Sequence, residues 1–74
     1  MDQYQIGDVV KVKDEKGTHI IYKIDIVYDE EPPYEFFFEY ATDKSAWHNH
    51  DELTLVRKAD KESIKELIKS LSNH

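Results

Sequence analysis

The feature that most constrains this chain is an alternating run at residues 18–28. Every second position of the run carries a large apolar or aromatic side chain, namely Ile20, Tyr22, Ile24, Ile26 and Tyr28. Successive side chains of a β-strand point to opposite faces, so this period predicts a strand with one apolar face. Ile21 and Val27 fall on the other face, and we therefore expect the strand to lie in a sheet with two partly apolar sides.

Further strands follow from shorter runs of the same period. Residues 6–12, 35–40 and 53–56 alternate, and a short strand is expected to begin at Trp47. The stretch 14–17 ends in Gly17, which can take a positive φ, and predicts a hairpin turn. Pro32 and Pro33 lack backbone donors and predict a loop. We therefore expect four or five strands, with Tyr22, Phe36, Phe38 and Tyr40 filling the interior.

The C-terminal segment has a helical period instead. Ile64, Leu67, Ile68 and Leu71 recur at the spacing of one helical face, which predicts an α-helix over 61–71 with Asp60 as its N-terminal cap. An isolated helix of this length is marginal in water, so it must dock. We expect it to cover the sheet face that carries Ile21, Val27 and Phe37, or to close one end of a barrel.

The chain of 74 residues is predicted to form a single domain with a thin core. A strand region at 1–58 precedes the helical region at 59–74. There is no cysteine, so disulfides and thiolate metal sites are excluded. The N-terminus has no charged and apolar signal pattern, and no run approaches the length of a membrane span, so we expect a protein of the cytoplasm without a membrane role.

A resemblance to small SH3-like barrels is carried by two patterns. The first is Tyr4-x-Ile6-Gly7-Asp8-x-Val10-x-Val12, and the second is Trp47 followed by Glu52-Leu53-x-Leu55-Val56. Together they resemble the short SH3-like proteins of phages and prophages of Gram-positive bacteria. The resemblance covers residues 4–57 and implies an antiparallel barrel of four to five strands in a bacterial host cell, but it implies no activity.

The charge is unevenly distributed along the chain. Residues 1–58 hold 13 acidic residues against seven Lys and Arg, whereas residues 59–74 hold three of each. A net negative field opposes the approach of phosphates, so direct binding of nucleic acid is disfavoured.

His48 and His50 permit two interpretations. Two histidines at i and i+2 on a strand, with Asp51 or Glu52 nearby, could ligate zinc. Alternatively, 48–52 is a polar connection, with a single 3₁₀ turn, that leads into the last strand. We favour the connection and expect no metal and no cofactor.

No motif in the sequence indicates an enzyme. The serines lack a glycine-rich elbow, the chain has only two glycines, and the acidic run Asp29, Glu30 and Glu31 lies beside prolines in an exposed loop. We expect a protein without catalytic residues.

Nine aromatic residues exceed what so small a core can hide. We expect Tyr28, Tyr34 and Trp47 to form an aromatic surface rimmed by Asp29, Glu30 and Glu31, which would bind a basic protein partner by cation–π contacts and charge complementarity. Two alternatives stay open: a nucleic-acid-related protein, either a weak binder or an acidic DNA decoy, and a subunit of a homo-oligomer, with a monomer or weak homodimer expected in solution.

Overall fold

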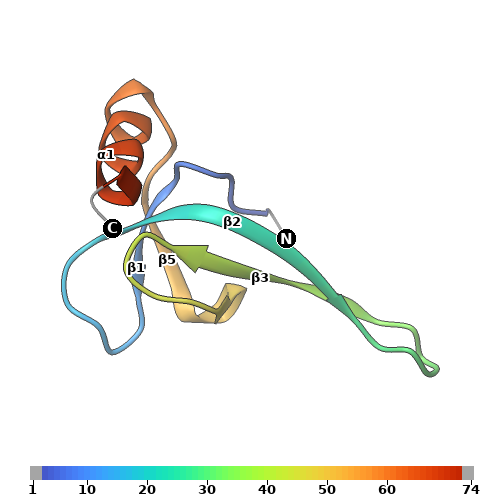
Figure 1. Ribbon diagram of the computed structural model, residues 1–74. Helices are drawn as coiled ribbons and strands as arrows, with labels where there is room; N and C mark the ends of the chain where they lie inside the picture. Colours follow the sequence, from blue (N-terminus) through green and yellow to red (C-terminus); the bar gives the residue numbers. More distant parts are fainter. Residues whose placement is uncertain (1–2, 73–74) are drawn as a thin grey trace.

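The computed structural model describes residues 3–72, which form a five-stranded antiparallel sheet followed by one α-helix (Figure 1). The elements in chain order are β1 (Val9–Val12), β2 (His19–Tyr28), β3 (Phe36–Thr42), β4 (His48–Asn49), the 3₁₀ helix η1 (His50–Glu52), β5 (Leu53–Arg57) and α1 (Lys61–Ser72). The predicted mainly-β class with a C-terminal helix is confirmed. The 3₁₀ turn expected between the last two strands is present as η1.

The sheet is open. Its strand order is β4-β3-β2-β1-β5, so β4 and β5 form its two edges within residues 3–72. The longest pairing joins β2 to β3 over seven registered pairs, from Ile21 opposite Thr42 to Tyr28 opposite Phe36. The turn before β2 places Gly17 at φ 76°, as its sequence predicts. The predicted closed barrel is therefore not formed, because the edge strands β4 and β5 are not paired with each other.

A β-bulge at Tyr22 changes which residues share a face of β2. Ile21 pairs with Thr42 and Lys23 with Ala41, so Tyr22 is an extra residue on its strand. The uninterrupted alternation expected from Ile20 to Tyr28 is therefore wrong. Ile24 lies on the same side as Ile21, because the bulge shifts the period by one residue.

Two small apolar clusters form the core of the body, the name used here for the part of the molecule outside the outer half of the β2–β3 hairpin. The larger comprises Val10, Val12, Ile21, Tyr40 and Leu53, with Tyr4, Ile24 and Phe38 packed against it. Tyr4 helps to cover this cluster, since its hydroxyl donates to the Leu53 carbonyl at 3.0 Å. Of the aromatic residues expected inside, only Tyr40 is fully buried, whereas Phe36 is 64% exposed and Tyr22 is 37% exposed. The body is too small to extend to the outer half of the β2–β3 hairpin.

The second cluster packs α1 against the sheet. It consists of Val9, Ile20 and Leu67, so the helix packs on the Ile20 side of the sheet. The expectation that it covers Ile21, Val27 and Phe37 is wrong, because Ile21 belongs to the larger cluster. The predicted cap is confirmed, since Asp60 Oδ1 accepts from the Ser63 amide at 2.8 Å.

The backbone around Gly7 brings the helix close to the sheet. Gly7 has a φ of 95°, and a Cβ there would lie 2.5 Å from Ile64 Cδ1. The next residue, Asp8, is buried and accepts from the Gln5 amide and from the Ala59 amide, both at 2.9 Å. The Gly-Asp pair therefore joins the start of the chain to the segment that leads into α1.

Candidate functional site

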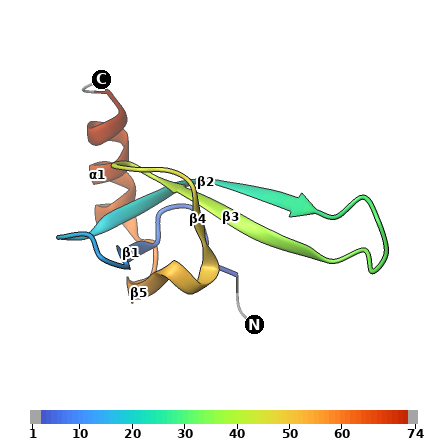
Figure 2. The same cartoon turned by 90° about the horizontal axis from the view of Figure 1, so that it is seen from below.

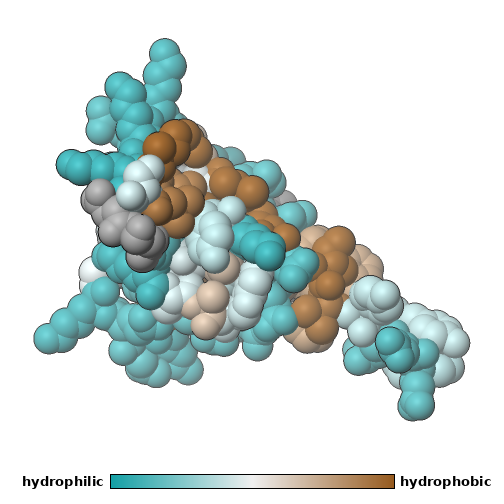
Figure 3. Space-filling model, viewed as in Figure 1, coloured by the Kyte–Doolittle hydropathy of each residue, from teal (hydrophilic) through white to brown (hydrophobic). Residues whose placement is uncertain are grey.

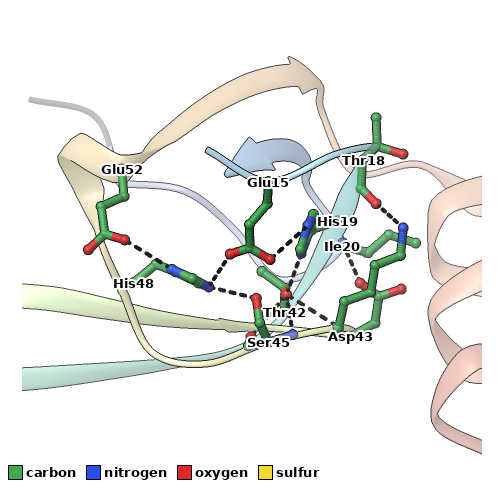
Figure 4. A network of polar contacts seen from close by, with 10 residues as sticks. Glu15, Thr18, His19, Ile20, Thr42, Asp43, Ser45, His48 and Glu52 are labelled. Carbon is green, nitrogen blue, oxygen red and sulfur yellow. Dashed lines mark hydrogen bonds and ion pairs between the residues drawn. The ribbon is translucent and has the colours of Figure 1, made fainter. Parts of the chain in front are cut away.

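Two groups of side chains could carry a function. One is a partly buried polar cluster at the end of the sheet remote from the hairpin tip, and the other is the outer half of the β2–β3 hairpin. The cluster joins the β1–β2 turn, β2, β3 and β4, and its members are Glu15, His19, Thr42, Ser45, His48 and Glu52 (Figure 4).

His48 lies at the centre of one half of the cluster. Its Nε2 is 2.8 Å from Ser45 Oγ, and its Nδ1 is 3.1 Å from Glu52 Oε2. A serine, a histidine and a carboxylate in this order have the separations of a nucleophilic relay. The hydrogen bond from His48 lowers the pKa of the Glu52 carboxyl, with a smaller effect from the Asn49 amide.

The surroundings of Ser45 favour a structural role over catalysis. Acyl transfer needs backbone amides directed at the oxyanion beside the nucleophile. Here the amides of Lys44 and Ser45 both donate to Thr42 Oγ1, at 3.3 and 3.0 Å. The Ser45 carbonyl in turn accepts from Thr42, so these groups close the β3–β4 loop.

His19 forms the other half of the cluster. It is buried, its Nδ1 is 2.9 Å from Thr42 Oγ1, and its Nε2 is 3.8 Å from Glu15. Burial lowers the pKa of His19, and this outweighs the opposing attraction of the Glu15 carboxylate. The neutral His19 imidazole therefore links β2 to β3 through its hydrogen bond with Thr42.

The two histidines of the predicted connection face different neighbours. His48 lies in the polar cluster, whereas the His50 ring stacks on Tyr4 with centroids 4.5 Å apart. Over residues 3–72, no three His, Asp or Glu side chains are placed to share a metal ion. The alternating His48 and His50 therefore do not converge on one point.

The hairpin is the more distinctive feature of the surface. Residues 24–40, here called the arm, form a two-stranded ribbon whose inner end, at Ile24 and Tyr40, belongs to the larger cluster and whose outer part projects from the body (Figures 1 and 2). The molecule measures 42 × 21 × 21 Å along its principal axes, and the arm accounts for the elongation. α1 lies at the opposite end of the molecule.

One side of the arm, here called the aromatic face, consists of Ile26, Tyr28, Phe36 and Phe38. The register places Ile26 opposite Phe38 and Tyr28 opposite Phe36. The rings of Phe36 and Phe38 meet edge to face, with centroids 6.0 Å apart. Exposure rises along the ribbon to 66% at Tyr28, so this is a ladder of side chains that begins on the core and ends in solvent.

The other side of the arm, here called the acidic face, alternates charge and apolar groups. Its residues are Asp25, Val27, Asp29, Glu35, Phe37 and Glu39. The register places Asp25 opposite Glu39 and Val27 opposite Phe37. The ladder continues by one hydrogen bond, in which the Asp29 amide donates to the Glu35 carbonyl at 2.9 Å. Two pairs of carboxylates therefore flank one apolar pair.

The arm also carries the whole net charge of the chain. It contains six acidic residues and no Lys or Arg, whereas the formal net charge of the protein is −6. Among the described residues, the ion pairs involve Glu15, Glu52 and Asp60 as the acids, so no arm carboxylate takes part. Like charges directly opposite each other destabilise a strand pair, and no ion pair among the described residues offsets the repulsion between Asp25 and Glu39.

The six residues predicted as a binding surface fall into two places. Tyr28, Asp29, Glu30, Glu31 and Tyr34 lie at the tip, where Asp29, Glu30, Glu31 and Pro32 line a shallow hollow. Trp47 lies at the base beside β4, and the Lys23 ammonium is 5.4 Å from its ring centroid. Five residues separate Lys23 from Tyr28, about 16 Å along a strand, so Trp47 is not part of the tip.

Sequence reasoning missed several residues of the arm. Asp25, Phe37 and Glu39 were outside the predicted surface, and Phe36, which is 64% exposed, was assigned to the core. Phe38 was also assigned to the core, and it does pack against the larger cluster. The sequence did contain a signal for this arrangement. A hairpin whose loop is centred on Pro32 places Asp25 opposite Glu39, as the structure does. The extent of the body that could cover these residues was not encoded in any local pattern.

Neither a protein-family model, nor a curated protein, nor a solved structure matches this chain. Among residues 3–72, no helix has the length and apolar character required to cross a bilayer.

Proposed function

We propose that this protein is a non-enzymatic interaction module that presents its arm to a basic protein partner. The observation that supports this proposal is the coincidence, in one projecting hairpin, of the entire net charge and of most of the exposed aromatic side chains. Charge complementarity would steer the partner to the arm, and the apolar groups would supply contact area.

The exposure of the aromatic residues is the first line of support. Tyr34 is 73% exposed, Tyr28 66% and Phe36 64%. Contiguous apolar surface on a small protein commonly marks an interaction site. Aromatic residues also contribute disproportionately to the affinity of protein interfaces, since they bury a large area at a small cost in conformational entropy.

The length of the ribbon is the second line of support. A two-stranded hairpin is at best marginally stable in water without a third strand or a packed layer. From Ile26 outward, the arm has neither within the described residues. A partner that covers one face would supply the missing layer, and binding would then order the arm further.

The strand order supports a relation to SH3-like barrels. β5 returns to pair with β1, so the first and last strands are neighbours, and η1 connects β4 to β5. The module proposed here is an SH3-like fold of phage or prophage origin that acts in the host cytoplasm. Determination of the genes beside its own would test this origin.

Backbone amide spectra give the direct test. An isotope-labelled sample would be titrated with a lysine-rich amphipathic peptide. A second sample would be titrated with a control peptide of the same length and sequence, except that each lysine is replaced by glutamate. We expect shifts of the amides of 24–40 with the lysine peptide alone, weakened by added salt. Unchanged arm amides with the lysine peptide would refute the proposal, whereas shifts confined to the body would move the site elsewhere.

A further inference from the structure

The helix α1 carries an exposed apolar surface outside the arm. Leu67 and Ser63 are its buried residues, at 5% and 0% exposure. The other members of the predicted apolar stripe are exposed by 37% at Ile64, 59% at Ile68 and 39% at Leu71. Because each residue turns a helix by about 100°, Ile68 lies beside the docked side and not on it, whereas Ile64 borders Gly7, where an added Cβ would lie 2.5 Å from its Cδ1. Apolar surface gathers over α1 in Figure 3.

A row of lysines borders the exposed stripe. Lys61, Lys65 and Lys69 are all exposed, and helical geometry places them next to Ile68 on the side away from Leu67. Glu62 and Glu66 lie beyond the lysines, farther from the stripe. The outer surface of α1 is therefore apolar and basic, the complement of the acidic face.

The spacing of charges also matches between the two surfaces. On the acidic face, the Asp25–Glu39 pair and the Asp29–Glu35 pair are four residues apart, about 13 Å along a strand. On α1, Lys61 and Lys69 are eight residues apart, about 12 Å along a helix. Val27 and Phe37 lie between the two charged pairs of the arm. On the helix, Lys65 lies between Lys61 and Lys69, and the exposed Ile68 lies beside this row.

We propose that the partner of the arm is a second copy of this chain, whose α1 docks on the acidic face. The inference rests on the function proposed above and names the partner for that site. Each carboxylate pair would accept one lysine ammonium, and Val27 and Phe37 would contact the exposed stripe of the helix. The net charge of the arm opposes contact between two arms, whereas the outer surface of α1 combines three exposed lysines with exposed apolar side chains.

The arrangement of the two surfaces determines the symmetry. The arm and α1 lie at opposite ends of the molecule, so an arm cannot reach the helix of its own chain (Figures 1 and 2). The contact between copies is therefore heterologous, and repeated contacts produce a ring or an open chain of molecules. A ribbon and a short helix bury less than the roughly 1,600 Å² of a standard interface, so we expect association at tens to hundreds of micromolar protein, weakened by salt.

Sedimentation velocity with three double variants tests the inference. Asp25→Asn with Glu39→Gln disables the arm, and Lys61→Glu with Lys69→Glu disables the helix. Lys11→Glu with Lys16→Glu is the control matched to the helix variant, since it lowers the net charge by the same four units at exposed positions away from both surfaces. Circular dichroism would establish that each variant is folded.

We expect the average mass of the wild type and of the control to rise with concentration at low salt. The arm variant and the helix variant should each remain monomeric. Their equimolar mixture should give a one-to-one dimer and nothing larger, because it contains a single functional arm–helix combination. A monomeric wild type at hundreds of micromolar, or a mixture without a complex, overturns the inference. If such a monomer still binds the lysine peptide through its arm, the proposed function stands and only the identity of the partner is wrong.

Discussion

Asp25 and Glu39 lie directly opposite each other on β2 and β3, and neither has an ion-pair partner among the described residues. Such a pair of like charges destabilises the ribbon in the free protein, but it is available to a cation from outside. The arrangement predicts that stability and binding respond in opposite directions when the pair is neutralised.

Asp25→Asn should therefore raise the free energy of unfolding by about 0.5 kcal/mol, because it removes the repulsion across the strands. The same substitution should weaken binding of the lysine peptide severalfold. Urea denaturation and peptide titration measure the two effects on one sample. Asp51→Asn is the control, since Asp51 is exposed and lies outside the arm. A variant that is less stable than the wild type would contradict this account of the pair.

Gly7→Ala should cost about 3 kcal/mol of stability and displace α1. Its φ of 95° is unfavourable for alanine, and the new Cβ would lie 2.5 Å from Ile64 Cδ1 and 2.9 Å from the Ala59 side chain. Gly17→Ala is the matched control, because Gly17 also has a positive φ but its nearest contact is 3.6 Å away. We expect Gly17→Ala to cost about 1 kcal/mol. Equal losses in thermal denaturation would show that Gly7 does not determine the position of the helix.

Neighbouring residues of α1 should respond differently to truncation. Leu67→Ala removes the helical member of the Val9–Ile20–Leu67 cluster and should cost about 2 kcal/mol. Ile68→Ala changes a side chain that is 59% exposed and should alter monomer stability by less than about 0.5 kcal/mol. Dilute samples are needed for the denaturation curves, so that association does not contribute. A larger loss at Ile68 than at Leu67 would mean that the helix docks through its apolar stripe.

Stability should decline as the pH falls from about 7 towards 5. Burial keeps the pKa of His19 below the value of about 6.5 that is usual for histidine, so the unfolded chain takes up a proton at a higher pH than the folded protein does. The stability contribution is complete above the unfolded pKa and is lost as the pH falls below it. Glu15, Asp43, Lys44 and His48 are the charged or titratable groups that act on His19, and Glu15 opposes the loss.

His19→Asn tests the origin of this pH dependence. Asparagine places a polar atom near the position of Nδ1, where it can still reach Thr42, but it does not titrate. We expect a flatter dependence of the free energy of unfolding between about pH 5 and 7. An unchanged slope would assign the pH dependence to another group.

The regular elements of this fold were predictable because their signals are local. The presence of the strand β2 and of the helix α1, the turn at Gly17 and the cap at Asp60 each depend on a few neighbouring residues. The predictions that failed concern packing, which depends on the whole molecule. Of the apolar stripe of α1, only Leu67 is buried, together with Ser63, because Leu67 packs on Val9 and Ile20, which come from two different strands.

The candidate site was predictable only at its tip. An acidic run beside two prolines indicates an exposed loop in any fold, so Asp29 to Tyr34 could be placed there. Trp47 could not be excluded, since its distance from the tip depends on how β4 pairs with β3. The exposure of Phe36 was equally hidden, because an alternating aromatic run is the same in a buried strand and in a projecting ribbon.

The bulge at Tyr22 also determines how this chain can vary in length. Without Tyr22, Lys23 would follow Ile21 in regular register opposite Ala41, and every side chain beyond it would keep its side of the ribbon. Removal of one residue elsewhere between Lys23 and Tyr28 would exchange the two faces of the arm relative to the body. Within β2, Tyr22 is therefore the position where a one-residue deletion would leave the two faces of the arm in place.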